Sequence, residues 1–223
     1  DIRPRVELDQ AILENITAFM LSNTGNITSA NRITVAASIG DNRTTEKYLR
    51  ELVKSFVFYR ADRYDIIGLK HTRTNAKFYP VDTGLMNTIL YGHEMNESAL
   101  LETVVYLELI RRGYRVSVGS YRNKEIDFAA WIDDDTVEFY QVALRLDDER
   151  TLKRELDSFL KLDPESRKVL ITLDRDEHRM PDGVELINVV DWLLDRSPHR
   201  PPMTMDRCGS AHTCKVPDLN AGR

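Results

Sequence analysis

The order of its periodic apolar segments constrains the fold of this chain most strongly. Between residues 100 and 112, Leu101, Val104, Val105 and Leu109 recur at helical spacing, and Gly113 follows in the position that favours glycine after a helix. Three strand-like segments, a helix, two more strand-like segments and a last helix come next, at residues 114–118, 125–132, 137–143, 148–161, 168–173, 184–190 and 191–195. This order predicts an α/β fold with a mixed sheet.

The first 82 residues have a different order, with short helices before strands. Helical spacing covers residues 8–21, and a second short helix starts near residue 29. Gly40-Asp41-Asn42 is a turn signal, and Thr44 is a suitable N-cap for a third helix reaching residue 56. Strand-like stretches follow at residues 57–64 and 77–81. Three helices and a hairpin in this order are typical of a winged helix-turn-helix.

These patterns predict three parts of the chain. We expect a winged helix-turn-helix over residues 1–82, a mixed-sheet domain over residues 83–196 and a disordered tail over residues 197–223. The tail holds four of the eight prolines and almost no apolar periodicity. The start at Asp1 rather than Met suggests a fragment or a trimmed product.

The composition argues against two broad classes of protein. A net charge of -5 is not that of a chain that is basic throughout and coats nucleic acid. The sequence contains neither an apolar run near the ~20 residues of a membrane span nor a signal-peptide pattern, so we expect a cytoplasmic protein without a membrane partner. Cys208, His212 and Cys214 lack a paired Cys-x-x-Cys, which argues against a metal site in the tail.

Several segments together resemble the C-terminal region of a prokaryotic family of AAA-type ATPase-like proteins, the domain of unknown function 4143 family. The resemblance covers roughly residues 5 to 195, and the segment from Thr44 to Asp65 is similar to the winged helix of that family. The other matching stretches are Asn75-Ala-Lys-Phe-Tyr-Pro-Val-Asp-Thr-Gly-Leu-Met-Asn, Leu100-Leu-Glu-Thr-Val-Val-Tyr-Leu-Glu-Leu-Ile-Arg-Arg-Gly-Tyr, Lys124-Glu-Ile-Asp-Phe and Phe139-Tyr-Gln-Val-Ala.

The resemblance implies a restriction-endonuclease-like core for residues 83–196, and an ATPase domain upstream. The upstream domain of the family carries a phosphate-binding loop, whereas this chain contains no G-x-x-x-x-G-K-[ST]. We therefore expect that the chain as given does not hydrolyse ATP. Its ATPase partner would be an upstream or separate domain.

Three residues match the positions of the active site that the resemblance implies. Such nucleases hold Mg²⁺ or Mn²⁺ on carboxylates, and the cation activates water. The helix position falls on Glu102 and the strand position on Asp127, which period-2 alternation places on the opposite face from Ile126 and Phe128. The third position falls on Gln141. The alternative for Glu102 is a plain structural role near the start of its helix.

The same match shows that the catalytic signature is degraded. The family arrangement ends in Glu-x-Lys, but here Gln141 carries no charge and Ala143 stands where lysine is required. Lys124 is predicted on the wrong face, and only Lys153 on the following helix could substitute from elsewhere.

A basic segment lies on the predicted winged helix. Residues 43–77 carry nine Lys or Arg against four acidic residues, a net +5, whereas the rest of the chain carries -10. The candidate DNA-binding residues are Lys47, Arg50, Lys54, Arg60 and Arg63. The alternative is a solvated helix face with pairs such as Glu46 with Arg50.

Three functional hypotheses remain from the sequence. The leading one is a DNA-binding, nuclease-like but catalytically degenerate module of an AAA-type ATPase, with no cofactor required. The second is a divalent-metal nuclease that uses Glu102, Asp127 and Gln141. The third is a protein-interaction or regulatory module of the ATPase. The sequence favours no oligomeric state.

Overall fold

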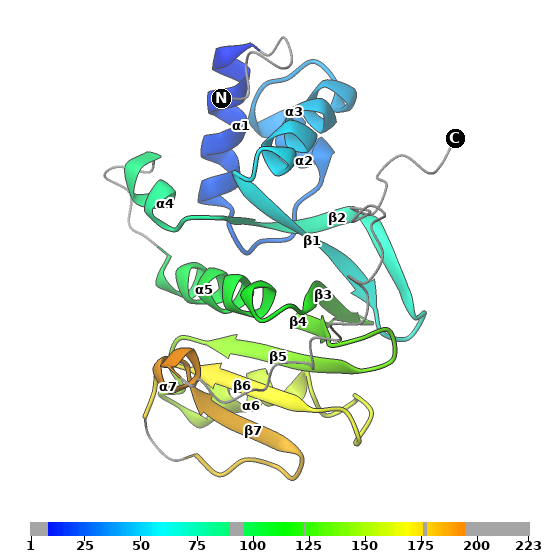
Figure 1. Cartoon of the computed structure of the whole chain (residues 1–223), viewed down its shortest axis with the longest axis vertical. Helices are drawn as coiled ribbons and strands as arrows, with labels where there is room; N and C mark the ends of the chain where they lie inside the picture. The colour runs from blue at the N-terminus through cyan, green and yellow to red at the C-terminus, as the bar shows by residue number, and fades with distance from the viewer. Residues whose placement is uncertain (1–8, 90–95, 123, 176–177, 195–223) are drawn as a thin grey trace, which may run out of the picture.

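The computed structural model describes residues 9–89, 96–122, 124–175 and 178–194. In this part of the chain, one seven-stranded sheet has the order β2-β1-β3-β4-β5-β6-β7 (Figure 1). The strands are β1 (Phe58–Asp65), β2 (Lys70–Pro80), β3 (Arg115–Tyr121), β4 (Lys124–Trp131), β5 (Val137–Ala143), β6 (Lys168–Thr172) and β7 (Val184–Asn188). The helices are α1 (Gln10–Ser22), α2 (Ala30–Ala36), α3 (Asn42–Lys54), α4 (Gly84–Ile89), α5 (Glu97–Arg111), α6 (Glu149–Asp157) and α7 (Val189–Leu194). The predicted tail lies outside the described residues.

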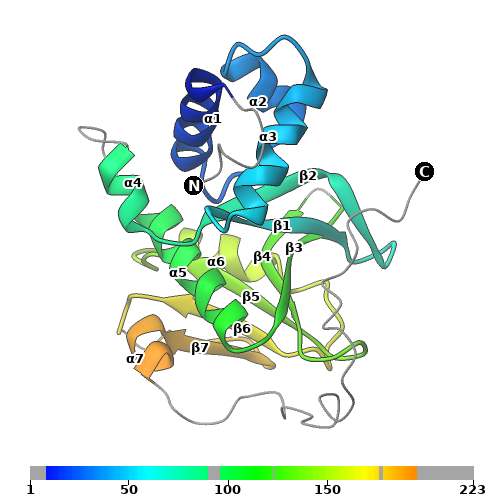
Figure 2. The ribbon, with the colours of Figure 1, turned by 45° about the horizontal axis from the view of Figure 1, so that its top comes forward.

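The sheet mixes parallel and antiparallel pairs, which confirms the predicted mixed α/β fold. Strands β1 and β2, β3 and β4, and β4 and β5 pair antiparallel, while β1 and β3, β5 and β6, and β6 and β7 pair parallel. Helices α5 and α7 cover one face of the sheet, where Val105, Leu109 and Trp192 pack on its core. Helix α6 covers the other face, as Figure 2 shows, and Phe159 directly after it is buried there.

Helices α1, α2 and α3 form a separate layer on one end of the β1–β2 hairpin (Figures 1 and 2). Their buried side chains, among them Ile16, Ile33 and Leu52, share one apolar cluster with Phe58 and Phe78 of the hairpin. The hairpin itself belongs to the large sheet, since β1 also pairs with β3. The sheet therefore crosses the domain boundary predicted at residue 82.

Side-chain caps explain where the helices begin. Asp9, Ser29, Asp41, Asn96 and Asp148 each accept a hydrogen bond from the backbone N–H three residues later, which satisfies a donor that the first turn leaves free. The prediction of Thr44 as the cap of α3 is therefore wrong. Asp41 takes that role, because its carboxylate accepts from both the backbone N–H and the hydroxyl of Thr44, at 2.8 and 2.9 Å.

The ends of several elements differ from their predicted positions. Helix α5 ends as expected, with Gly113 at a φ of +91°. Strand β2 is much longer than predicted and begins at Lys70, because it pairs along the whole of β1 despite a register shift after Asp62. Helix α6 stops at Asp157, and the next residues form a turn in which the Phe159 N–H donates to the Leu156 carbonyl.

An irregularity in the pairing of β3 with β4 changes the faces of the strand that carries Asp127. Ser117 pairs with Ala129 but Gly119 pairs with Ile126, so β4 contains one extra residue. As a result Ile126 packs on the α6 side of the sheet and Phe128 on the α5 side. The prediction that both lie on one face is wrong, because period-2 alternation breaks at the extra residue.

We predict that Gly119→Ala destabilises the protein by about 1–3 kcal/mol, the range for overpacking a core. A Cβ at residue 119 would lie 2.9 Å from the Cβ of Ile126, closer than two such atoms can approach. The matched control is Gly40→Ala, because nothing lies within 4 Å of a Cβ there. Urea denaturation of both variants measures the change, and equal midpoints would contradict the prediction.

Candidate functional site

The site begins where β4 and β5 stop pairing. The last antiparallel pair between these strands is Phe128 with Tyr140. One residue further, side chains replace the ladder: the backbone N–H of Asp127 donates to Gln141 Oε1 at 3.3 Å, and the N–H of Val142 donates to Asp127 Oδ2 at 2.9 Å. The first bond holds the backbone of Asp127 and the second orients its carboxylate, at the point where the two strands stop pairing.

A buried lysine forms the centre of the site. Lys77 on β2 is only 3 % exposed, and its Nζ lies 2.8 Å from Glu102 Oε1, 2.5 Å from Glu125 Oε1 and 3.6 Å from Asp127 Oδ1. The carboxylates come from α5 and from β4, so the ammonium joins three elements that are distant in the sequence. Burial of an ammonium is tolerated only with such partners.

Tyr79 fixes the position of Glu102, and the absence of a side chain at Gly25 leaves room for it. The hydroxyl of Tyr79 donates to Glu102 Oε1 at 2.6 Å, and Tyr79 is fully buried. Gly25, in the loop between α1 and α2, has a φ of +75°, and a Cβ on it would lie 3.2 Å from Glu102 Oε2. The N-terminal helical layer therefore reaches the site through a position that favours glycine.

Glu155, an acidic residue on the other side of the sheet, holds Gln141. Glu155 on α6 accepts a hydrogen bond from Gln141 Nε2 at 2.9 Å, and both side chains are buried. Because Glu155 fixes the amide nitrogen, the amide oxygen of Gln141 faces the backbone of Asp127. Arg154 pairs with Glu155 at 2.8 Å and balances its charge.

The mutual electrostatics of the cluster change two pKa values in the same direction. Burial alone would lower the pKa of Lys77, but the carboxylates of Glu102, Asp127 and Glu125 outweigh burial and raise it. Burial and the neighbouring Glu102 raise the pKa of Asp127 to about 7, although Lys77 and the N–H of Val142 act in the opposite direction. The ammonium of Lys77 is therefore charged, and the carboxyl group of Asp127 is partly protonated near neutral pH.

The structure brings together Glu102, Asp127 and Gln141, the three residues that the sequence selects. Their catalytic role stays a prediction. Ala143 is buried on the α6 side, and Lys124 pairs with Asp157 at 2.8 Å. The lysine of the site is instead Lys77, one of the nine basic residues of segment 43–77. The charge count of this segment includes Lys77, but Lys77 is buried against three carboxylates and adds no cation to the surface.

Sequence reasoning also missed Glu125 and Glu155 as members of the site. The one signal for Lys77 was its place among Ala76, Phe78 and Tyr79, because a charged residue within an apolar strand needs a buried partner.

Glu108, the other glutamate in the middle of α5, does not belong to the site. It follows Glu102 by six residues, which places it about 120° round the helix. It binds Arg111 and Arg112 instead, at 2.6 and 2.7 Å.

The residues of the site do not fit the divalent cation that the resemblance implies. The ammonium of Lys77 already lies within 3.6 Å of one oxygen from each of the three carboxylates. Among the residues that the structure describes, no group of three or more acidic, histidine or cysteine side chains has an arrangement that could hold a metal ion. The arrangement is a closed ion-pair cluster with an internal cation.

The basic residues of the N-terminal layer have a different environment. Arg43, Lys47, Arg50 and Lys54 are all exposed on α3, at a spacing that places them along one side of the helix. One ion pair on this helix joins Lys54 to Glu51 at 3.5 Å, and it differs from the predicted pair of Glu46 with Arg50. Arg60 binds Asp62 at 2.7 Å, and Arg63 is half-buried with an Nε that has no hydrogen-bond partner among the described residues.

Comparisons with known proteins identify similar but uncharacterised sequences. Residues 3–96 match a family described as a domain of unknown function, DUF8612. An uncharacterised protein of Haemophilus influenzae is 37 % identical over 190 residues, which cover 83 % of this chain and 46 % of that protein. The uncharacterised protein MJ1544 of Methanocaldococcus jannaschii is 29 % identical over 173 residues, which cover 66 % of this chain and 37 % of that protein.

The chain thus spans less than half the length of these curated relatives. No solved structure matches it significantly. Among the described helices, none has the length and apolarity to cross a membrane.

We predict that the stability of the wild-type protein falls between pH 4 and pH 8 by more than that of Asp127→Asn. Because the pKa of Asp127 is raised from 3.8 to about 7, the folded protein binds this proton more tightly than the unfolded chain does. The stability that the proton contributes is complete below about pH 4 and is lost as the pH rises through about 7.

Chemical denaturation at several pH values measures this difference. We expect the gap in unfolding free energy between the two proteins to change by at least about 1 kcal/mol, since a pKa difference of one corresponds to about 1.4 kcal/mol. The control is Asp134→Asn, whose carboxylate is 92 % exposed. Parallel pH profiles for the wild type and Asp127→Asn would show that Asp127 is ionised across this range.

Proposed function

We propose that this chain is a double-stranded DNA-binding module whose nuclease-like centre is catalytically inactive. The observation that carries the proposal is the exposed basic row on α3, formed by Arg43, Lys47, Arg50 and Lys54. A helix that presents cations to solvent along one side can neutralise successive phosphates. In this interpretation α1, α2, α3 and the β1–β2 hairpin are a winged helix, and α3 is its recognition helix.

The remaining sheet has a structural role in this proposal. A restriction-endonuclease-like core with Lys77 in place of the cation keeps the shape of a nuclease without its metal. The carboxylates that would bind a metal ion in an active nuclease form internal ion pairs here, as in the contact of Glu102 with Lys77. In this proposal Glu102 of the core holds the winged helix in place, because it accepts the hydrogen bond of Tyr79 and lies next to Gly25.

The relatives give the proposal its wider frame. Because they are more than twice as long as the matched region, we propose that the module serves a larger protein, with an ATPase domain upstream as the resemblance to the 4143 family implies. ATP would bind in that domain, and the assembly would act in the cytoplasm.

We predict that the chain binds a DNA duplex and that Lys47→Gln combined with Arg50→Gln weakens binding about tenfold or more. For each phosphate that the variant no longer neutralises, the slope of log affinity against log salt should also fall by about 0.9. The matched control is Lys153→Gln with Lys161→Gln, which removes the same charge from exposed residues near α6. Fluorescence anisotropy with a labelled duplex across a salt series gives both quantities.

The outcomes separate the hypotheses. Absent or salt-independent binding would rule out a DNA-binding role, and equal losses in both double variants would rule out α3 as the contact. Retained binding to an ATPase partner after removal of the α3 charges would favour the protein-interaction hypothesis.

A second candidate function is a divalent-metal nuclease, and one observation favours it. The lysine that the sequence lacks at Ala143 is present in space as Lys77, beside Glu102 and Asp127. A strongly raised carboxyl pKa in such a cluster is also typical of catalytic groups. The closed ion-pair geometry argues against it.

We predict that the wild-type chain neither cleaves DNA nor gains thermal stability with Mn²⁺ or Mg²⁺. Lys77→Ala, in contrast, should gain a Mn²⁺-dependent rise in melting temperature, because it leaves three carboxylates without their cation. Lys161→Ala serves as the exposed control. Metal-dependent cleavage by the wild type that disappears in Asp127→Ala would establish the nuclease hypothesis instead.

A further inference from the structure

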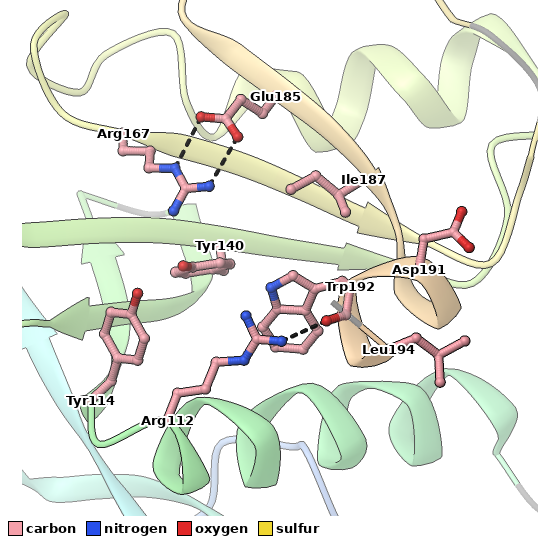
Figure 3. A pocket seen from close by; sticks show the side chains of 9 residues that line it. All are labelled: Arg112, Tyr114, Tyr140, Arg167, Glu185, Ile187, Asp191, Trp192 and Leu194. Carbon is pink, nitrogen blue, oxygen red and sulfur yellow. Dashed lines mark hydrogen bonds and ion pairs between the residues drawn. The ribbon is translucent and has the colours of Figure 1, made fainter. Parts of the chain in front are cut away.

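A pocket on the α5 and α7 face of the sheet lies apart from the ion-pair cluster. Its volume is about 480 Å³, within the size range of sites for small molecules. Figure 3 shows its walls, which come from the C-terminal end of α5, from β5, β6 and β7, and from α7. It is lined by Arg112, Tyr114, Tyr140, Arg167, Ile187 and Trp192, among others.

Most polar groups around this pocket are bound within the protein. Arg167 forms two bonds to Glu185, at 2.9 and 3.0 Å, and a third to Glu138. The hydroxyls of Tyr114 and Tyr140 both donate to Glu138, at 3.1 and 2.6 Å. These groups are saturated, so they build the walls and do not select a ligand.

Two hydrogen-bond donors are exceptions. Arg112 uses Nε on Glu108 and Nη2 on the backbone carbonyl of Trp192, but its Nη1 has no partner among the described residues. The indole N–H of Trp192 has none there either, although the ring is only 6 % exposed. In Figure 3 these two nitrogens lie beside each other, on the side that faces Tyr140.

The charges that line the pocket are balanced, because Arg112 and Arg167 lie there with Glu185 and Asp191, and each carboxylate has an arginine partner, Arg167 at 2.9 Å and Arg175 at 3.3 Å. Glu108 is one carboxylate shared by two guanidinium groups, those of Arg111 and Arg112. Burial would raise the pKa of Glu108, but the hydrogen bonds from Arg111 and Arg112 outweigh burial and lower it. Glu108 is therefore ionised and shared with Arg111, so it does not occupy the whole guanidinium of Arg112.

The remaining walls of the pocket are largely aromatic. The rings of Tyr114 and Tyr140 are 6.4 Å apart and nearly perpendicular, and those of Tyr140 and Trp192 are 6.4 Å apart and tilted. The guanidinium of Arg112 lies over the ring of Trp192, 4.3 Å from its centre, and this contact holds the two donors next to each other. Ile187 adds an apolar surface.

We propose that this pocket binds a small aromatic carboxylate. The carboxylate accepts hydrogen bonds from Arg112 Nη1 and Trp192 Nε1, two donors that a planar anion can engage together. The ring of the ligand lies against Tyr114, Tyr140 and Ile187. This site is independent of the ion-pair cluster and of DNA binding.

The test uses three probes of matched shape, benzoate, benzamide and benzylamine, with the full chain labelled with ¹⁵N. The chain has two tryptophans, and the indole signal that Trp192→Phe removes belongs to Trp192. We expect this signal to move during titration with benzoate, less with benzamide and not with benzylamine. Trp192→Phe keeps an aromatic side chain but deletes the indole donor, and should weaken benzoate binding about tenfold, as for one hydrogen bond to a charged group.

The matched control is Trp131→Phe, the same change at the other tryptophan, which should keep the benzoate affinity. Backbone amide signals report the affinity in both variants, and their dispersion shows that each variant is folded. The proposal is overturned if benzylamine binds as tightly as benzoate, if the Trp192 indole signal stays fixed at saturating benzoate, or if both variants lose the same affinity.

Discussion

The buried ammonium of Lys77 is the contact that connects the layers of this protein. A lysine side chain that is 3 % exposed would be strongly unfavourable alone, because removal of an ion from water costs several kcal/mol even after relaxation. Its three carboxylate partners lie on α5 and β4, while the lysine itself comes from the edge strand β2. Each of these elements must keep its position for the charge to stay paired. The loop before α2 also depends on this arrangement, because a Cβ on Gly25 would lie 3.2 Å from Glu102 Oε2.

The same pairing decides what the cluster can do chemically. A nuclease centre needs carboxylates whose oxygens are available to a cation, whereas here Lys77 uses one oxygen of each. Three carboxylates surround one lysine, and burial together with the neighbouring Glu102 raises the pKa of Asp127. The lysines and arginines of α3 are in the reverse situation, because they are exposed to solvent. Only exposed cations can exchange their counterions for phosphates, so DNA affinity is expected at α3 and not at the cluster.

Local sequence signals predicted most of the elements but little of their assembly. Apolar periodicity placed α1, α3, α5 and β5 within about three residues of their observed ends. The end of α5 was readable from Gly113, since a positive φ after a helix favours glycine. The cap of α3 was not, because both Asp41 and Thr44 are good capping residues and only the carboxylate reaches the free donors.

The errors share a physical cause, which is that the pairing of one strand with another is absent from the residue pattern of either strand alone. The extra residue in β4 lies between two pairs with β3, Ser117 with Ala129 and Gly119 with Ile126. It puts Ile126 and Phe128 on opposite faces of the sheet. The central role of Lys77 depends on β2 lying in the same sheet as β4, which no spacing within residues 77–81 reveals. Counting charges then places this lysine with the solvated cations of α3.

A comparison of two cations, Lys77 and Arg112, shows where a ligand can act on this fold. Lys77 contacts three carboxylates, so an incoming anion would have to displace an existing partner. Arg112 also has protein partners, since it donates to Glu108 and to the backbone carbonyl of Trp192. A planar guanidinium has five N–H donors, and these bonds leave Nη1 without a partner among the described residues. A charged donor that is held in place can bind a ligand at little entropic cost, and one hydrogen bond to a charged group contributes about 1.5–3 kcal/mol after exchange with water. Binding of a small anion is therefore expected where the ion-pair network is incomplete, beside Trp192, and not where it is closed.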